Sequence, residues 1–391
     1  MSDNIETKDM RVLILGGDGY LGWPTAMHLS SCGYEVAVAD NYLRRRLSRE
    51  EDVEPLCQVP NLHERSLRWQ KTSGCTVQVF VGDLQNWDFV SEVFEKFSPD
   101  VIVHYAEQPS APYSMLNRRA ATLTLQNNLA VTANTIFAVR EFCPDAHIIK
   151  LGTMGEYGTP NIDIEEGWLD ISHNGRSDRF LYPRQAGSLY HTTKIMDTDL
   201  LWYYVRMWDL RVTDLMQGPV YGIFTNEMGK DESLFTFYSY DELFGTVLNR
   251  FVVQAVAGYP LTVYGKGGQT RGYINIKDTL SCVRLSVEKP AAKGELRIFN
   301  QFTETFSVND LASRVMSVGK SLGIDVRVKN LPNPRKELEE HYYNPKHTGL
   351  IKLGLKPNLL TDNTLAQMME YVLKHKNNIR KHKIFRGTKW A

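Results

Sequence analysis

A phenol and an ammonium lie four residues apart in the run Tyr-His-Thr-Thr-Lys, from Tyr190 to Lys194. In a helix, residues with this spacing share a face, with their Cβ atoms about 5–6 Å apart. A tyrosine hydroxyl ionises near pH ~10, and a neighbouring cation favours the ionised form. The spacing therefore predicts a tyrosine that takes a proton from an alcohol, with Lys194 lowering the pKa of Tyr190. A solvated helix face is the alternative interpretation.

A second motif follows the apolar run 11–15, where Gly16, Gly19 and Gly22 have the spacing of a dinucleotide-binding turn. Glycine permits a tight bend, and the N-terminus of the following helix offers N–H groups to a pyrophosphate. The next apolar run ends in Asp40. A carboxylate there accepts hydrogen bonds from ribose hydroxyls and repels a 2'-phosphate, so the pattern favours NAD.

NADP stays open as an alternative because three arginines follow Asp40. Arg44, Arg45 and Arg46 could neutralise a 2'-phosphate, although such a run is also typical of a solvated turn.

The composition excludes several classes of protein. The 391 residues include 45 basic and 45 acidic side chains, so no net charge attracts nucleic acid or an acidic membrane surface. The five cysteines have no C-x-x-C spacing, which argues against a zinc site and a disulfide framework. The first ten residues lack the pattern of a secretory or transit peptide, and no apolar run is long enough to span a membrane. We expect a cytoplasmic protein with no metal, no nucleic-acid partner and no membrane insertion.

Strand and helix patterns alternate through the first half of the chain. The expected strands are 11–15, 35–39, 77–81, 101–104 and 148–151, and the expected helices include 90–97 and 122–143. This rhythm predicts an α/β fold with a doubly wound parallel Rossmann-type sheet. We expect residues 1–216 to form the NAD-binding domain that carries the catalytic residues, with 44–74 as a helical insertion.

The alternation weakens after Gln217. We expect residues 217–391 to form a smaller mixed lobe that mainly binds the substrate and can return elements to the main sheet. The lobe should hold a helix at 245–258, a strand at 261–264 and a loop at 265–272. The Gly-, Pro- and Asn-rich stretch 158–185 is expected to form a loop over the site.

Polar residues at strand ends mark the expected site. Gly16, Asp40, Asp83, Glu107 and Thr153 all fall at carboxyl ends of strands, where doubly wound sheets bind ligands. A hydroxyl at Thr153 can bond the alcohol that the tyrosine deprotonates. Arg271 and Arg335 are the best contacts for a phosphate, with surface salt bridges as the alternative.

Together, these motifs resemble the extended short-chain dehydrogenase/reductase family that works on nucleotide sugars. Several longer segments resemble the branch of this family that forms UDP-sulfoquinovose, and they are residues 16–20, 111–115, 151–167, 261–273 and 333–335.

The resemblance implies that UDP-glucose and sulfite become UDP-sulfoquinovose and water. NAD would oxidise C4, water would leave across C5 and C6, sulfite would add at C6, and the hydride would return to C4. Such an enzyme forms a C–S bond, although it is formally classed with hydrolases of C–S bonds. It supplies sulfolipid or sulfoglycan biosynthesis. A homodimer joined by a helix pair is implied as well.

The resemblance also assigns residues to roles. The catalytic trio would be Thr153, Tyr190 and Lys194. The NAD-binding residues would be Gly16, Asp18, Gly19, Tyr20, Leu21, Gly22, Asp40, Asn41, Arg44, Arg45, Asp83, Leu84, Asn128, Tyr190 and Lys194. The substrate-binding residues would be Gln108, Thr153, Gln217, Asn249, Val263, Tyr264, Gln269, Arg271 and Arg335.

Two positions differ from the related 4,6-dehydratases, which carry an Asp-Glu pair directly after the active-site threonine. This chain has Met154 and Gly155 there, and His191 stands beside Tyr190. We hypothesise that His191 moves the proton at C5 or at the C6 hydroxyl, with Glu156 assisting or orienting. A structural role for the histidine is the alternative.

A further departure is Pro109, where the resemblance leads us to expect an arginine; Arg118 or Arg119 could replace that contact. The rival functions are a UDP-glucose 4-epimerase, a nucleotide-sugar 4,6-dehydratase and a non-catalytic NAD sensor. The absent Asp-Glu pair counts against the dehydratase, and the complete trio counts against the sensor.

Overall fold

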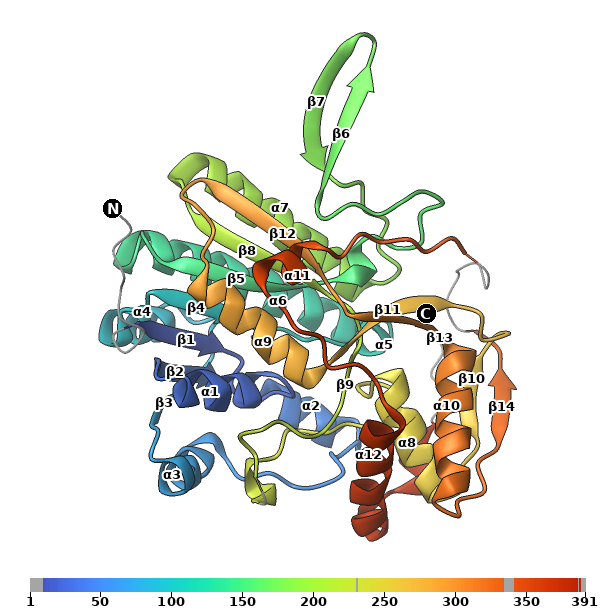
Figure 1. The fold of residues 1–391 in the computed structure, drawn as a ribbon. Helices are drawn as coiled ribbons and strands as arrows, with labels where there is room; N and C mark the ends of the chain where they lie inside the picture. The colour runs from blue at the N-terminus through green and yellow to red at the C-terminus, as the bar shows by residue number, and fades with distance from the viewer. Residues whose placement is uncertain (1–9, 230, 334–340, 386, 388–391) are drawn as a thin grey trace.

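Seven parallel strands form the centre of the molecule (Figure 1) in the order β12-β8-β5-β4-β1-β2-β3. The computed structural model describes residues 10–229, 231–333, 341–385 and 387. The strands of this sheet are β1 (Arg11–Leu15), β2 (Glu35–Asp40), β3 (Val77–Val81), β4 (Val101–His104), β5 (His147–Thr153), β8 (Arg211–Gln217) and β12 (Glu295–Gln301). The predicted α/β doubly wound fold is confirmed.

Helices cover both faces of the sheet, which explains why its central strands are apolar along their whole length. The helices α1 (Gly22–Ser31) and α9 (Ile276–Glu288) contribute to one core cluster, and α4 (Trp87–Phe97), α6 (Arg118–Phe142) and α7 (Leu189–Trp208) contribute to the other. The predicted helices 90–97 and 122–143 are present, and both begin three or four residues earlier than expected.

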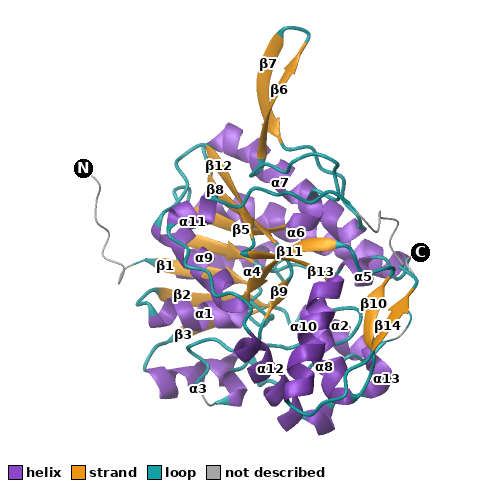
Figure 2. Cartoon of the chain, turned by 45° about the vertical axis from the view of Figure 1, so that its right-hand side comes forward, coloured by secondary structure: helices purple, strands orange, loops and turns teal. Residues whose placement is uncertain are grey.

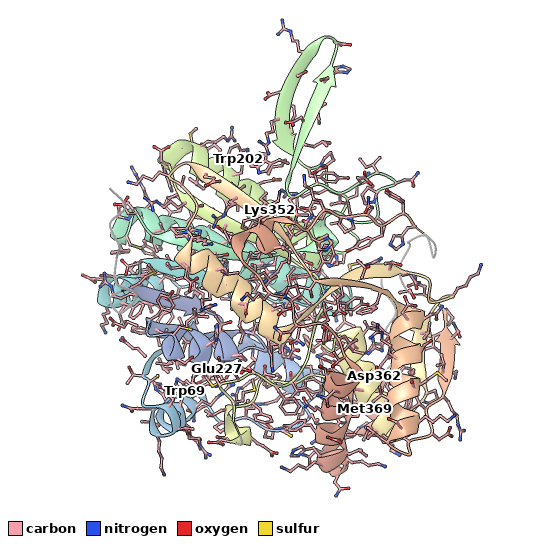
Figure 3. The ribbon with its side chains drawn as sticks, viewed as in Figure 1. Trp69, Trp202, Glu227, Lys352, Asp362 and Met369 are labelled. Atoms are coloured by element: carbon pink, nitrogen blue, oxygen red, sulfur yellow. The ribbon has the colours of Figure 1, made fainter. Side chains whose placement is uncertain are left out.

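Only part of the stretch 44–74 is an insertion, although the sequence led us to expect that all of it is. They contain most of α2 (Leu43–Glu50) and all of α3 (Leu62–Ser73). α3 packs against β3 and buries Trp69 (Figure 3), so it serves as the crossover helix between β2 and β3. Only α2 and residues 51–61 are additional.

The expectation of an irregular loop at 158–185 is wrong for the middle of that stretch. The strands β6 (Trp168–His173) and β7 (Arg176–Leu181) pair as an antiparallel hairpin that projects from the body (Figures 1 and 2). Its turn is Asn174-Gly175, with φ of 49° and 74°. Asn-Gly is the strongest short signal for a two-residue hairpin turn, so this hairpin was visible in the sequence.

The second region packs beside the carboxyl end of the main sheet. It contains the sheet β13-β11-β9 and the parallel pair β10-β14. Its strands are β9 (Val220–Tyr221), β10 (Leu261–Tyr264), β11 (Thr270–Asn275), β13 (Glu304–Ser307) and β14 (Val328–Leu331), and its main helices are α8 (Val247–Ala257), α10 (Val308–Ser321) and α12 (Asp362–Lys374). The predicted strand 261–264 matches β10, and α8 lies within the predicted helix 245–258. The predicted loop 265–272 is wrong at its end, because β11 begins at Thr270.

The domain division between residues 216 and 217 stays a prediction. Two elements from beyond this point, α9 and β12, belong to the layers of the main sheet. The remaining short elements are α5 (Ala111–Ser114), η2 (Met154–Glu156), η3 (Glu232–Leu234), α11 (Gly349–Leu353), η4 (Lys376–Asn378) and α13 (Lys381–Ile384). Within the described residues, no helix is long and apolar enough to cross a membrane, and no three His, Cys, Asp or Glu side chains are grouped to hold a metal ion.

Candidate active site

A cavity of about 750 Å³ lies between the carboxyl end of the main sheet and the second region. Eighteen of the predicted site residues line it: Gly16, Gly19, Tyr20, Leu21, Gly22, Asp40, Asn41, Arg44, Asp83, Leu84, Thr153, Tyr190, His191, Gln217, Asn249, Tyr264, Gln269 and Arg271. The structure thus brings residues predicted to bind the cofactor and residues predicted to bind the substrate together in one cavity.

The glycine turn leaves no room for side chains. Gly16 has φ of +90°, and a Cβ atom added to Gly22 would overlap the carbonyl oxygen of Gly16. The N-cap residue of α1, Leu21, has no side-chain cap, so the first N–H groups of this helix are left for another acceptor at the cavity. A pyrophosphate provides such an acceptor, and the turn therefore fits NAD.

Asp40 is held at the end of β2 by backbone N–H groups. Its carboxylate accepts hydrogen bonds from the N–H of Asp18 at 2.9 Å and from the N–H of Tyr42 at 2.6 Å. Burial, followed by repulsion from Asp18, raises the pKa of Asp40 to about 6. The carboxylate is therefore ionised at neutral pH and lines the cavity where a ribose acceptor is needed.

Asp18 and Arg45 do not line the cavity, and their assignment to NAD contacts stays a prediction. Arg45 donates to both carboxylate oxygens of Asp18, at 2.6 and 2.7 Å, and to the carbonyls of Val59 and Pro60. The pair joins α2 and the following loop to the glycine turn. Arg45 is thus neutralised by a carboxylate and is no partner for a 2'-phosphate.

Arg44 does line the cavity, and its guanidinium is fixed in place. It donates to Ser239 Oγ at 2.6 Å and lies 3.5 Å from the centroid of the Phe244 ring. Burial lowers the pKa of Arg44 to about 10, so it remains a cation at neutral pH.

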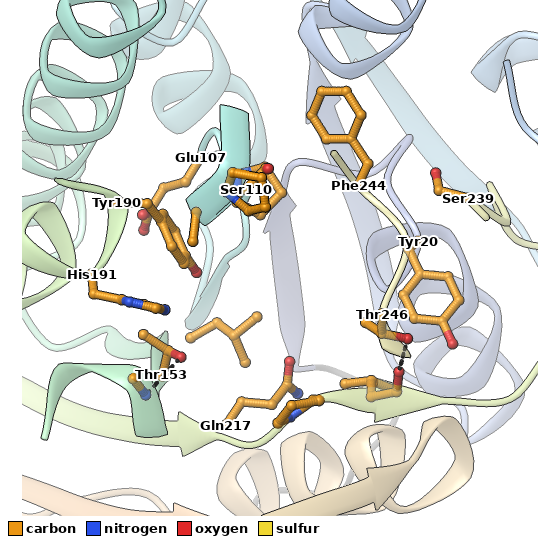
Figure 4. Close-up of a pocket in the computed structure, with 18 of the residues that line it drawn as sticks. Tyr20, Glu107, Ser110, Thr153, Tyr190, His191, Gln217, Ser239, Phe244 and Thr246 are labelled. Carbon is orange, nitrogen blue, oxygen red and sulfur yellow. Dashed lines mark hydrogen bonds between the residues drawn. The ribbon is translucent and has the colours of Figure 1, made fainter. Parts of the chain in front are cut away.

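Tyr190 and Thr153 face each other across the cavity (Figure 4). Tyr190 lies in the first turn of α7, and Thr153 is the last residue of β5. The hydroxyl of Thr153 accepts a hydrogen bond from the N–H of Gly155 at 3.2 Å. Two hydroxyls held by a helix and a strand can bond one alcohol between them.

Lys194 lies behind this pair and outside the cavity lining. Its ammonium forms an ion pair with Glu107 and donates to the carbonyl of Leu151. Burial, followed by the charge of Glu107, raises the pKa of Tyr190 well above its usual range. The expected lowering of this pKa by Lys194 is therefore wrong, because burial and the negative charge of Glu107 both act in the opposite direction.

His191 occupies space that only a glycine at position 155 provides. A Cβ atom at Gly155 would overlap the imidazole near Nε2. The ring is oriented by Ser188, whose Oγ lies 3.0 Å from Nδ1. The imidazole thus stands beside Tyr190 and Thr153 at the edge of the cavity (Figure 4).

Glu156 is fully buried beneath the cavity, which corrects its assignment as a proton-transferring group. Its carboxylate accepts from the N–H of Thr153 at 3.2 Å and from Lys150 Nζ at 3.3 Å. The contacts close a capping box around η2. Glu156 therefore orients Thr153, in line with the other half of the hypothesis.

The substrate side of the cavity is built mainly from the second region. Arg271 Nη1 lies 2.8 Å from His341 Nε2, and the Tyr264 hydroxyl donates to Glu242 at 2.6 Å. Gln217, at the end of β8, donates to Gln301 at 3.0 Å. Three charged or polar side chains thus converge on a space of nucleotide-sugar size.

Three residues with predicted ligand contacts are buried and lie outside the cavity lining, so these contacts stay predictions. Gln108 bonds Ser110 and Thr124, and Asn128 accepts from the N–H of Gln108 and donates to Thr193. Val263 lies in the core under β10. Arg335 falls outside the described residues.

Some lining residues were not predicted, among them Pro109, Ser110, Asn127, Phe237, Ser239, Glu242, Phe244, Arg250, Asn333 and Tyr343. Glu107 also lines the cavity; it was noted at a strand end and given no role. Arg118 and Arg119 line a separate cavity of about 330 Å³ with Arg46, so they do not replace an arginine at position 109. Arg250 is a cation in the main cavity that was not predicted, because it belongs to no recognisable sequence motif.

A family model described as NAD dependent epimerase/dehydratase family matches residues 12–300. The chain belongs to the NAD dependent epimerase/dehydratase family. NAD is its cofactor, as the turn at Gly16 to Gly22 and Asp40 led us to expect.

Relatives within this family cover nearly the whole chain. The UDP-sulfoquinovose synthase of Spinacia oleracea, described as chloroplastic, is 49% identical over 97% of this chain and 79% of its own length. The UDP-sulfoquinovose synthase of Sulfolobus acidocaldarius is 44% identical over 97% of this chain and 98% of its own. The UDP-glucose 4-epimerase of Bifidobacterium longum, solved with NAD+ and UDP, has a TM-score of 0.72 at 18% identity and covers 95% of this chain and 100% of that one. The last likeness shows the fold of the family alone.

Proposed function

We propose that this chain is a UDP-sulfoquinovose synthase, which converts UDP-glucose and sulfite to UDP-sulfoquinovose and water. The observation that carries the proposal is the pairing of His191 with Gly155 next to Tyr190 and Thr153. A 4,6-dehydratase needs a glutamate at position 155, and here an imidazole fills that space. The names of the spinach and Sulfolobus relatives support the same reaction.

The first task of the site is to oxidise C4 of the glucose. Thr153 and Tyr190 would hold the C4 hydroxyl between their own hydroxyl groups and direct its proton towards Tyr190. NAD, when bound along the glycine turn, supplies the acceptor and later the donor of the C4 hydride. Glu156 supports this step indirectly, because it fixes the backbone of Thr153.

The second task is loss of water across C5 and C6. A ketone at C4 acidifies the C5 proton, and the imidazole of His191 is placed to move that proton or the proton that leaves with the C6 hydroxyl. Ser188 holds Nδ1 and leaves Nε2 on the side of Gly155 and the cavity. The resulting enone accepts sulfite at C6, and reduction at C4 completes the cycle.

The nucleotide would lie on the side of the cavity formed by the second region. Arg271, with Arg335 from the sequence prediction, would bind the pyrophosphate. Gln217, Tyr264 and Gln269 would contact the sugar or the base. Sulfite is proposed as the second substrate, and the choice between free sulfite and a protein-bound donor is left open by the proposal.

Product analysis tests the proposed reaction against its rivals. Purified protein with UDP-glucose and sulfite should give a sulfonated nucleotide sugar by mass spectrometry. An epimerase would give UDP-galactose, a dehydratase would give a 4-keto-6-deoxy sugar, and an NAD sensor would leave UDP-glucose unchanged. Any of these three results with sulfite present contradicts the proposal.

The homodimer is proposed from the surface of α6 and α7, which pack together. Phe137, Met196, Tyr203 and Met207 on these helices are between 42% and 54% exposed. Light scattering after gel filtration should give a dimer, and the double change Tyr203→Glu, Met207→Glu should give a monomer. Leu67→Glu is the control, because Leu67 is an exposed apolar side chain on α3. A monomeric unmodified protein contradicts the proposed homodimer.

The cytoplasmic location is likewise a proposal, and it rests on the sequence alone.

A further inference from the structure

The first turn of α7 carries two side chains of the proposed reaction, Tyr190 and His191, and two serines hold its backbone. The first N–H groups of a helix have no partner within that helix. The hydroxyl of Ser188, the N-cap residue, accepts a hydrogen bond from the N–H of His191 at 3.2 Å. The N–H of Tyr190 donates to Ser114 Oγ at 3.1 Å. Ser114 belongs to a different element, α5, so a contact between two elements fixes the backbone of the tyrosine.

The hydroxyl of Ser114 is oriented to accept this hydrogen bond. Its own O–H donates to the carbonyl of Ala111 at 2.7 Å, so a lone pair of the oxygen is left for the N–H of Tyr190. The side chain is 1% exposed and lies outside the cavity lining. Ser114 can therefore affect the reaction only through the groups that it holds, and Tyr190 is the one that lines the cavity.

The other end of α5 is attached to the second region. Ser110, the N-cap residue of α5, donates to the carbonyl of Leu243 and accepts from the N–H of Tyr113 at 3.0 Å. The ring of Tyr113 stacks on the ring of Phe244, with centroids 5.7 Å apart and planes inclined by 25°. Ser110, Phe244 and Tyr190 can be followed in Figure 4. One hydrogen bond and one ring stack thus join α5 to the second region.

The attached segment is part of the cavity wall. Residues 242–246 line the cavity. The carboxylate of Asp241 fixes their backbone, because it accepts from the N–H groups of Leu243 and Phe244 at 2.9 Å each. The Phe244 ring also holds the guanidinium of Arg44, which lies 3.5 Å from its centroid. This segment therefore borders the ligand space and contacts α5 at the same time.

We propose that Ser114 is a positioning residue for Tyr190. Through α5, the position of the tyrosine then depends on the bond between Ser110 and the second region. The Tyr190 hydroxyl has to meet the C4 hydroxyl of the sugar together with Thr153, and a misplacement of about 1 Å can cost 10²-fold in rate. The role of Ser114 rests on the proposed C4 oxidation.

A purely structural role is the competing explanation, because Ser114 also bonds within α5. Ser286 provides the matched control. It is 0% exposed, and its hydroxyl donates to the carbonyl of Cys282 at 2.9 Å. It lies on α9, which contributes no residue to the cavity lining. Ser286→Ala thus removes a buried, hydrogen-bonded serine hydroxyl without touching the site.

The rate of cofactor reduction tests the positioning role. The NAD-loaded protein is mixed with UDP-glucose, without sulfite, in a stopped-flow instrument, and the absorbance of the reduced cofactor is followed. UDP-glucose with hydrogen and with deuterium at C4 are compared. Ser114→Ala should be about 10- to 10²-fold slower, with an isotope effect at least as large as that of the unmodified protein. Its dissociation constants for NAD and UDP should be unchanged, and Ser286→Ala should keep the normal rate.

Ser110→Ala tests the link to the second region. It should slow cofactor reduction as well. The double variant Ser110→Ala, Ser114→Ala should be no slower than the slower single variant, because the two serines act through one connection.

The outcomes separate this proposal from the proposed function. Equal rates for Ser114→Ala and Ser286→Ala overturn the positioning role, as does a slower rate that comes with weaker binding of NAD or UDP. A normal rate for Ser110→Ala, or effects that multiply in the double variant, overturn the link. If Ser114→Ala does not fold, Ser110→Ala decides alone, and a normal rate overturns the proposal. Absence of cofactor reduction by the unmodified protein contradicts the proposed C4 oxidation itself.

Discussion

The imidazole of His191 lies in the space that a side chain at position 155 would need, and the bare Cα of Gly155 is what admits it. The two positions are far apart in sequence and belong to different elements, η2 and α7. Their complementarity means that a residue larger than glycine at position 155 would require the imidazole to move from this place. The site therefore places an imidazole at the position where the sequence comparison led us to expect a glutamate in 4,6-dehydratases.

Gly155→Ala tests this complementarity. The added methyl group should push the imidazole away from the cavity and lower formation of sulfonated product about 10²-fold, because displacement of a catalytic group by about 1 Å has that effect. Gly187→Ala is the matched control, since Gly187 lines the same cavity and a Cβ atom there meets nothing within 4 Å. Equal turnover by the two variants would show that the position of His191 is unimportant.

His191→Ala separates the two halves of the reaction. Without the imidazole, product formation should fall about 10²–10⁴-fold, the usual contribution of a general acid or base. Reduction of the cofactor by UDP-glucose should be largely unchanged, because Thr153 and Tyr190 remain. Cofactor absorbance and product mass are measured in parallel. Unchanged product formation would remove His191 from the mechanism.

The close packing of the glycine turn predicts opposite effects of an alanine substitution at two of its residues. Gly22→Ala should cost more than 10-fold in NAD affinity and lower the melting temperature, because the new Cβ atom would overlap the backbone of Gly16. Gly19→Ala should keep the melting temperature, since its nearest neighbour would be 3.6 Å away. Calorimetric titration with NAD and thermal unfolding check both. A native melting temperature for Gly22→Ala contradicts the close packing of the turn.

NAD binding should weaken as the pH falls through about 6. Burial and Asp18 raise the pKa of Asp40 to about 6 in the folded protein, above the value of ~3.9 expected for an unfolded chain. Without nucleotide, protonation of this group therefore favours the folded state between pH 6 and 4, whereas ribose binding requires the ionised carboxylate. The dissociation constant for NAD, measured from pH 8 to 5, should rise below pH 6. Asp40→Asn should bind more weakly at pH 8 and lose this dependence; if its pH dependence equals that of the unmodified protein, another group is responsible.

Local motifs were enough to predict the fold and the cofactor end of the site. Gly16, Gly22 and Asp40 act through backbone geometry and a single carboxylate, both of which leave a clear pattern in the sequence. Glu107 was visible at a strand end, but its ion pair with Lys194 depends on how β4 and α7 meet. For the same reason, no motif identified the inward direction of Glu156.

The positions of two arginines, Arg45 and Arg250, could not be predicted from the sequence for the same reason. Arg45 points to Asp18 because α2 folds back over the glycine turn. Arg250 reaches the cavity because α8 of the second region closes its far side. Tertiary packing decides both, and neither has a local signature.

The fate of the C4 hydrogen in a sulfite-dependent reaction tests the central claim most directly. UDP-glucose with deuterium at C4 is incubated with the NAD-loaded protein in ordinary water, with and without sulfite, and the products are analysed by mass spectrometry. The proposed cycle gives a sulfonated nucleotide sugar that retains the C4 deuterium, and it forms only when sulfite is present. The same nonsulfonated product with and without sulfite would contradict the account.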